Sequence, residues 1–188
     1  HHRAMTLSAF LTVHLRPGTA CGDHAHDFTE IVYVDGCAGA VWFGDRREAF
    51  ADGDLFIHPA KSRHRATNRG AGRHHCLGLK GAGVEGLREG LARGTPELSA
   101  LFLGMAAELA RKAPRYRALM EAMAQEALVR LLRLQDAKDD AGAPVAPWMA
   151  GGEGSDKGGA APKLEEVRRR LEDDFARRID LTPLSGEL

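Results

Sequence analysis

Two hydrophobic patterns divide the chain at about residue 80. Before that point, short apolar runs rich in β-branched and aromatic residues, such as 30–34 and 40–43, are separated by glycine-containing turns. No helical periodicity lies between these runs, so residues 6–94 are predicted to form a β-sandwich or barrel. The turn signals are Asp35-Gly36, Gly44-Asp45, Asp52-Gly53-Asp54 and Asn68-Arg69-Gly70.

After the strands the spacing of apolar residues becomes helical. Thr95 and Pro96 form a good helix start, because a threonine hydroxyl caps the first turn and proline fits the first helical position. Pro114 is predicted to start a second helix within the range 95–135. Its wide apolar stripe either covers the strands or meets a partner chain. We expect the stripe to form a homodimer interface that includes Leu119, Met123, Leu128, Leu131 and Leu132.

Residues 136–162 interrupt this pattern with three prolines and repeated glycines, which predicts a flexible linker. A last amphipathic helix is expected from Lys163 to about Arg178, and Thr182-Pro183 has the form of another helix start. Three consecutive arginines flank the apolar side of this helix, either as a solvated face or as contacts to phosphate. They are Arg168, Arg169 and Arg170.

The composition is that of an ordinary globular chain. Among 188 residues, 26 are basic, 26 are acidic and 44% are hydrophobic, so the chain can bury a core without a disulfide or a metal. The zero net charge argues against a protein that coats nucleic acid. No apolar run is long enough to span a membrane, and no signal peptide is recognisable. Three cysteines without a CxxC motif fit a cytoplasmic protein.

The residues with the clearest chemical meaning are His24, His26 and Glu30. Their separations of two and four residues would place all three on one face of a strand. A second group follows the Asp52-Gly53-Asp54 turn and includes Pro59, His64 and Asn68. If both groups face the inside of a barrel, His64 adds a third imidazole to the first group.

These two groups resemble the two signature motifs of the cupin superfamily. The resemblance implies an α+β chain whose N-terminal part is a cupin-like β-barrel, a double-stranded β-helix or jelly roll, followed by α-helices. It also implies a divalent metal bound by His24, His26, Glu30 and His64. The donor set suits Zn, Fe(II), Ni, Mn or Cu, and a polar pocket without metal is the alternative. Two positions depart from the family pattern: Gly36 comes one residue early, and Lys61 replaces a usual glycine.

The segments 26–34 and 53–59 also resemble the sensor domains of AraC/XylS-type transcriptional regulators. That resemblance implies an effector-binding barrel (6–94), dimerisation helices (95–135), a linker (136–162) and the first helix of an incomplete helix-turn-helix DNA-binding domain (163–188). DNA would be read only through the missing C-terminal part. The barrel would bind a small-molecule effector, a metal or both. A metal-dependent cupin enzyme, such as a dioxygenase or isomerase, is the alternative.

Three other signals are given structural interpretations. Gly81, Gly83 and Gly86 have the spacing of a dinucleotide fingerprint, but no βαβ alternation surrounds them. Cys21 lies near His24 without a readable oxyanion arrangement, so it is not taken as a nucleophile. His58 alternates in direction with Ile57, so it points either into the pocket or out of it, and it is interpreted as structural.

Overall fold

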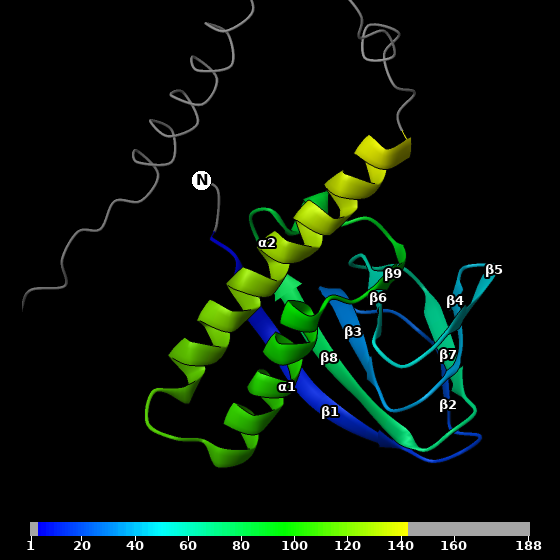
Figure 1. Cartoon of the computed structure of the whole chain (residues 1–188), viewed down its shortest axis with the longest axis horizontal. Helices are drawn as coiled ribbons and strands as arrows, with labels where there is room; N and C mark the ends of the chain where they lie inside the picture. The colour runs from blue at the N-terminus through cyan, green and yellow to red at the C-terminus, as the bar shows by residue number, and fades with distance from the viewer. Residues whose placement is uncertain (1–3, 143–188) are drawn as a thin grey trace, which may run out of the picture. The chain divides into compact units, whose positions relative to one another are not determined.

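The computed structural model describes residues 4–142, with side chains to residue 137. Two antiparallel sheets face each other, and two helices lie on the outer side of the larger one (Figure 1). The five-stranded sheet contains, in spatial order, β1 (Thr6–Leu15), β8 (Gly72–Lys80), β3 (Thr29–Asp35), β6 (Asp54–His58) and β9 (Gly90–Arg93). The four-stranded sheet contains β2 (Ala20–His24), β7 (His64–Asn68), β4 (Gly39–Phe43) and β5 (Arg46–Phe50). This architecture confirms the predicted α+β cupin-like fold.

The strands end at the turns that the sequence predicts. Gly36 and Gly53 have φ angles of 76° and 82°, a conformation that glycine adopts without steric cost. The chain reverses at both positions, and the Gly53 N–H donates to the Val34 carbonyl (2.9 Å). The strands β3 and β6 lie inside the larger sheet and are almost entirely buried, as their continuous apolar sequences indicate.

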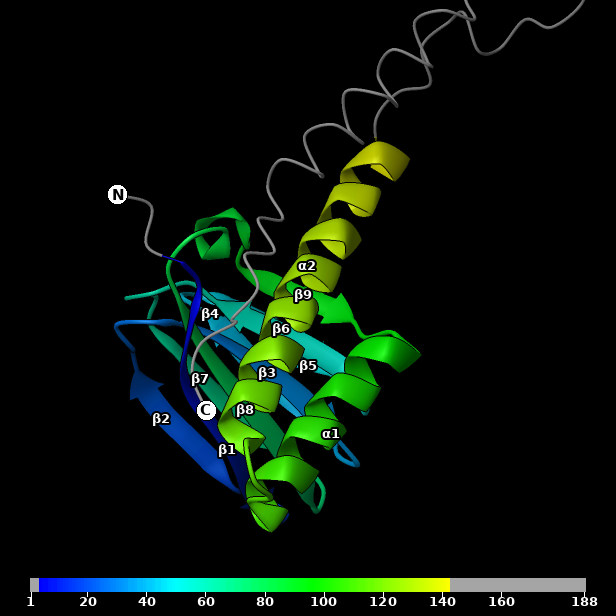
Figure 2. The same ribbon diagram turned by 90° about the vertical axis from the view of Figure 1, so that its left-hand side faces the viewer.

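The protein has two apolar cores on opposite faces of the five-stranded sheet. The inner core fills the space between the sheets and consists of Val32, Val34, Cys37, Val41, Phe43, Phe50 and Phe56. The outer core joins the sheet to the helices and includes Ile31, Leu55, Leu77, Leu79, Phe102, Met105, Leu128 and Leu131. Figure 2 shows both helices lying across this outer face. Because strand side chains alternate, the same strands supply both cores.

Helix α1 (Pro96–Arg111) begins as predicted, with the Leu98 N–H donating to the Thr95 hydroxyl. Helix α2 (Tyr116–Gly142) begins two residues after Pro114, because Arg115 adopts a left-handed conformation (φ 65°) at the turn.

The expected start of the linker at residue 136 is wrong. Helix α2 continues through residues 136–142, where alanines, aspartates and a lysine precede the first proline of that segment. The remainder of the predicted linker and the segment 163–188 lie outside the described residues. So do Arg168, Arg169 and Arg170.

The expected dimer interface also requires correction. Leu128 and Leu131 are 2% and 0% exposed within a single chain, because they pack in the outer core. Met123 and Leu132 are partly buried against the same core, and Leu119 is 48% exposed. The apolar outer face of the five-stranded sheet therefore covers most of the stripe. The assignment of Leu128 and Leu131 to an interface is wrong, whereas the association of two copies stays a prediction.

Two sequence signals without a catalytic assignment have structural explanations. The segment with the dinucleotide-like glycine spacing forms the turn and short 3₁₀ helix Val84–Gly86. All three cysteines are free.

Among residues 4–142, we find no helix with both the length and the apolar character that a membrane span requires.

Candidate metal centre

Four predicted ligands meet at one end of the barrel, between the two sheets. His24 is the last residue of β2, His26 lies in the β2–β3 connection, Glu30 is in β3 and His64 begins β7. One donor atom from each lies within 4.8 Å of all the others. The reasoning from a single strand face was wrong, because the chain crosses from the smaller sheet to the larger one between His24 and Glu30.

The Glu30 carboxylate is at the centre of this cluster. Its Oε2 lies 3.1 Å from Nε2 of His64 and 3.6 Å from Nε2 of His26. His24 is the register partner of His64 in the smaller sheet, and their ring centroids are 4.2 Å apart. The four side chains therefore converge on one small volume.

Backbone carbonyls determine which ring nitrogens face this volume. Nδ1 of His24 donates to the Gly22 carbonyl (2.7 Å), and Nδ1 of His64 donates to the Ser62 carbonyl (3.0 Å). Each neutral ring then presents the lone pair of Nε2 inward, which is the arrangement that carbonyls impose on metal-binding histidines.

This arrangement requires a positive charge between the ligands. The lone pair of His64 Nε2 faces a carboxylate oxygen of Glu30 at 3.1 Å, and two acceptors at that distance repel each other. A shared cation or an additional proton removes the repulsion. In addition, His26 Nε2 is buried and has no hydrogen-bond partner among the described residues. Both observations fit a bound metal ion.

The protonation states near neutral pH also suit a metal. Burial raises the pKa of Glu30, but the hydrogen bond that His64 donates when it carries the additional proton, together with the neighbouring imidazoles, outweighs burial and leaves that pKa below its ordinary value. Burial lowers the pKa of His26, although Glu30 opposes this effect. The site therefore offers an ionised carboxylate and a neutral imidazole, the forms that bind metals.

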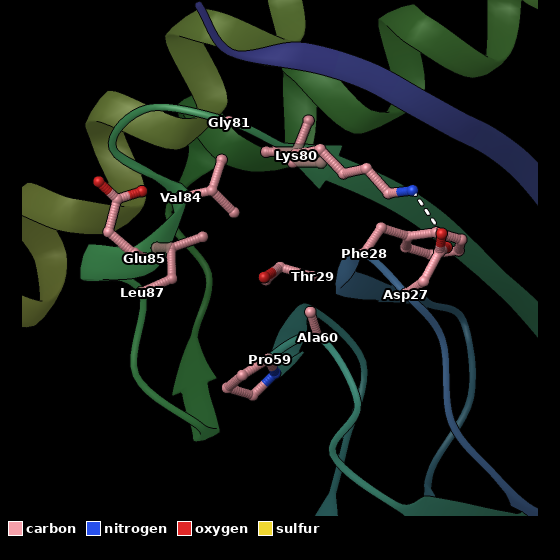
Figure 3. A pocket seen from close by; sticks show the side chains of 11 residues that line it. Asp27, Phe28, Thr29, Pro59, Ala60, Lys80, Gly81, Val84, Glu85 and Leu87 are labelled. Carbon is pink, nitrogen blue, oxygen red and sulfur yellow. Dashed lines mark hydrogen bonds and ion pairs between the residues drawn. The ribbon is translucent and has the colours of Figure 1, made fainter. Parts of the chain in front are cut away.

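Contacts from neighbouring segments position the connection that carries His26. The Lys61 N–H donates to the His26 carbonyl (2.7 Å), and Lys61 has a left-handed φ of 68° where the family pattern has glycine. The Phe28 ring stacks on the His26 ring, with centroids 4.6 Å apart. Figure 3 shows the hollow beside this segment, where Lys80 Nζ reaches Asp27 Oδ2 (2.6 Å). These contacts hold His26 towards Glu30 and His64.

His58 belongs to this centre, although it was interpreted from the sequence as structural. It is 1% exposed, and its ring stacks on His64 with centroids 3.7 Å apart. Both of its ring nitrogens are buried without a hydrogen-bond partner in the described part of the chain. Burial lowers its pKa to about 3, so His58 is neutral at ordinary pH. Its pairing with Glu30 across β6 and β3 could not be derived from spacing.

The barrel is open towards the edge strands β1 and β2. Leu11 and Val13 are exposed there, and a cavity of about 180 Å³ is lined by residues that include Val13, Cys21 and His74. Cys21 Sγ lies 3.6 Å from His24 Nδ1. Burial raises the pKa of the Cys21 thiol, so the cysteine lacks the thiolate character of a nucleophile.

The match to known families agrees with this geometry. Residues 11–77 match a family model described as a cupin domain. The match ends within β8 and says nothing about the helices. The sequence matches none of the curated proteins with which it was compared.

Several solved structures resemble part of the chain. A cupin superfamily protein from Desulfitobacterium hafniense has 11% identity and a TM-score of 0.35, over 39% of this chain and 80% of its own. KdgF from Halomonas sp. has 19% identity and a TM-score of 0.35, over 39% and 77%. A predicted oxalate decarboxylase from Thermotoga maritima has 20% identity and a TM-score of 0.35, over 37% and 64%. Resemblance at this level carries no information about substrate or activity.

Proposed function

We propose that this chain is the effector-sensing and dimerisation part of an AraC-type transcriptional regulator, with a divalent metal in its barrel. The observation that carries the metal is the inward-facing set of His24, His26, Glu30 and His64, with His64 Nε2 only 3.1 Å from the Glu30 carboxylate. Bound there, the metal would act as a Lewis acid towards a ligand that completes its coordination. The three imidazoles and one carboxylate suit several first-row metals.

Two features favour a regulator. Helices α1 and α2 follow the barrel directly and share a continuous core with its outer face, so a change in the sheet is transmitted to them through packed side chains. The sequence after residue 162, with its arginine-flanked apolar repeat, resembles the start of a DNA-binding domain. The three free cysteines are in keeping with a cytoplasmic location.

A metal-dependent cupin enzyme is the second candidate. The open edge between β1 and β2, with exposed Leu11 and Val13, favours it because a substrate could approach the centre from there. The apolar wall would then select a substrate with little charge on that side.

The metal is tested first on the purified full chain. After treatment with EDTA, the chain is titrated with Zn²⁺, Mn²⁺, Fe²⁺, Ni²⁺ and Cu²⁺, and binding is measured by calorimetry and elemental analysis. One ion per chain is expected, with at least about tenfold weaker binding in His64→Ala and Glu30→Gln. His14→Ala, which removes an exposed histidine outside the centre, serves as the control. Failure of all five ions to bind, or equal binding by the variants, contradicts the metal site.

The choice between regulator and enzyme is tested by hydrogen exchange with the preferred metal. If the chain is a sensor, metal binding should change the protection of amides in α2 as well as in the barrel, because a change in the barrel would be transmitted to the helices. Changes confined to β2, β3, β6 and β7 contradict the sensor and favour the enzyme.

A further inference from the structure

A second hollow lies on the opposite face of the five-stranded sheet from the metal centre. This groove has a volume of about 500 Å³ and lies between the edge formed by β1 and β8 and helix α1. Its size falls in the range of small-molecule sites. The groove is separate from the barrel because strand residues alternate: Arg73 and His75 of β8 face outwards, whereas His74 and Cys76 face the barrel.

The two walls of the groove differ in chemistry. The sheet supplies two cross-strand pairs of polar residues, Thr12 opposite His75 and His14 opposite Arg73. Helix α1 supplies an apolar wall in which Leu103 is 42% exposed. The remaining helical side chains are mostly alanines, whose small size keeps the groove open. They are Ala106, Ala107 and Ala110, and Leu109 also lines the groove.

A hydrogen-bonded chain fixes the polar wall. Asp35 can only accept, so Nε2–H of His75 donates to Asp35 Oδ2 (3.2 Å), and His75 Nδ1 accepts from the Thr12 hydroxyl (2.9 Å). The His75 side chain is 1% exposed, so it is buried beneath the groove and both of its ring nitrogens are used. Asp35 also binds Arg73 at 2.7 Å and holds the guanidinium at the mouth of the groove.

Among residues 4–137, the side-chain contact of Arg73 is its ion pair with Asp35, so its half-exposed guanidinium can offer further donors to a ligand. Its side chain is 49% exposed, and its contact with Asp35 joins Nη2 to Oδ2. A guanidinium has five N–H groups, and a fixed guanidinium binds a carboxylate through two parallel hydrogen bonds. His14 is exposed on the adjacent strand and offers a second donor when it is protonated or when its N–H is turned towards the groove.

We propose that this groove binds a small organic acid, with its acid group on Arg73 and His14 and its hydrocarbon part against the wall formed by α1. The polar wall would bind the acid group, and the exposed Leu103 with its neighbouring alanines would bind the hydrocarbon part. Neither wall depends on the metal, so the site is independent of the function proposed above. Straight-chain and aromatic acids share this chemistry and are distinguished by experiment.

The test uses the full chain in EDTA, so that no carboxylate binds through a metal. Sodium octanoate and sodium benzoate are titrated by calorimetry, with octan-1-ol as the uncharged control. We expect one saturable site for at least one of the acids. Arg73→Gln should weaken acid binding at least about tenfold while leaving the alcohol unaffected, because the variant removes only the charged donor.

A second variant tests the apolar wall without altering the sheet. Ala107 is exposed on α1, so Ala107→Trp is compatible with folding and fills the groove. It should abolish binding of the acid and of the alcohol alike. Arg65→Gln, which removes an exposed arginine on the smaller sheet, is the control and should bind like the wild-type chain.

Three results would overturn the proposal. The first is the absence of saturable binding of either acid to the wild-type chain. The second is equal acid affinity in Arg73→Gln and the wild-type chain. The third is a sedimentation result in which the wild-type chain is a dimer, Ala107→Trp is a monomer and neither acid binds. That result would make the groove an interface between two copies.

Discussion

The buried histidine His74 predicts a specific loss of stability in acid. It is 9% exposed on the inner face of β8, where its ring packs edge-on against Phe50 and Phe56. Its Nε2 is buried and has no hydrogen-bond partner among the described residues. Burial lowers the pKa of His74 from 6.5 to about 4, and the opposing charge of Glu30 only partly offsets this effect. His74 is therefore neutral in the folded protein at pH 5, whereas it is mostly protonated in the unfolded chain.

The sign of the effect follows from this difference in proton uptake. Between pH 6.5 and about 4 the unfolded chain binds the proton more readily, so the free energy of unfolding falls as the pH falls. One pKa unit corresponds to about 1.4 kcal/mol, so His74 alone should remove about 3 kcal/mol of stability between pH 7 and pH 4. Above pH 6.5 it should have no effect on the pH dependence.

The measurement compares wild type with His74→Leu by urea unfolding, followed by far-UV circular dichroism in EDTA at pH 7, 6, 5 and 4. Leucine has a similar volume and no titrating group. The difference in unfolding free energy between variant and wild type should grow in favour of the variant by about 3 kcal/mol from pH 7 to pH 4. His58 has a similarly lowered pKa, but it is present in both proteins and its contribution cancels.

Parallel stability curves would refute this reasoning. A constant difference between His74→Leu and wild type across the pH range would mean that the imidazole is protonated or hydrated in the folded state. The m value must also agree between the two proteins at each pH, since a change in m would indicate a change in the unfolded ensemble and not in the titration of His74.

Two further predictions concern packing. Leu131→Ala should lower the unfolding free energy by about 2–5 kcal/mol, because the side chain is fully buried in the outer core, whereas Leu119→Ala at an exposed position of the same helix should change it by less than about 0.5 kcal/mol. Urea unfolding checks both, and similar values for the two variants would contradict the described packing of α2. Gly39→Ala should lower the melting temperature strongly, because the added Cβ would lie 2.0 Å from the Thr67 carbonyl oxygen. Gly70→Ala should melt near the wild-type temperature, because nothing lies within 4 Å of the added Cβ. Equal melting temperatures for the two variants would contradict this account.

The features predicted well from the sequence depend on neighbouring residues. Turn glycines and β-branched runs set the strand ends, and a threonine before a proline set the start of α1, because each signal acts within a few residues. The sequence also indicated that His24, His26, Glu30 and His64 come together, although through a family resemblance, and their role as metal ligands stays a prediction. The strand-face argument failed because it assumed one strand where the chain crosses between sheets.

The features predicted poorly depend on which distant segments meet. Periodicity showed that one face of α2 is apolar, but it does not specify what covers that face. The same apolar pattern is expected whether a partner chain or the outer face of the five-stranded sheet covers the helix. Leu131 was assigned to a partner for this reason, and its own chain buries it. The pairing of β8 with β1 lies across more than 50 residues of sequence, so no local signal placed Thr12 beside His75.

His74 and His75 are adjacent in the sequence, but they lie on opposite faces of β8 and so have different surroundings. Adjacent strand residues face opposite sides, so at most one of these two histidines can join any single site. The sequence does not say which one, because parity gives alternation and not direction. The structure places His74 among phenylalanines on the inner face and His75 between Asp35 and Thr12 on the outer face. The first ring has no partner for its Nε2 among the described residues and is predicted to make the fold acid-sensitive, whereas the second is held by two hydrogen bonds, one of them to the Asp35 carboxylate that also pairs with Arg73. One imidazole and its sequence neighbour therefore differ in chemistry because the sheet separates them.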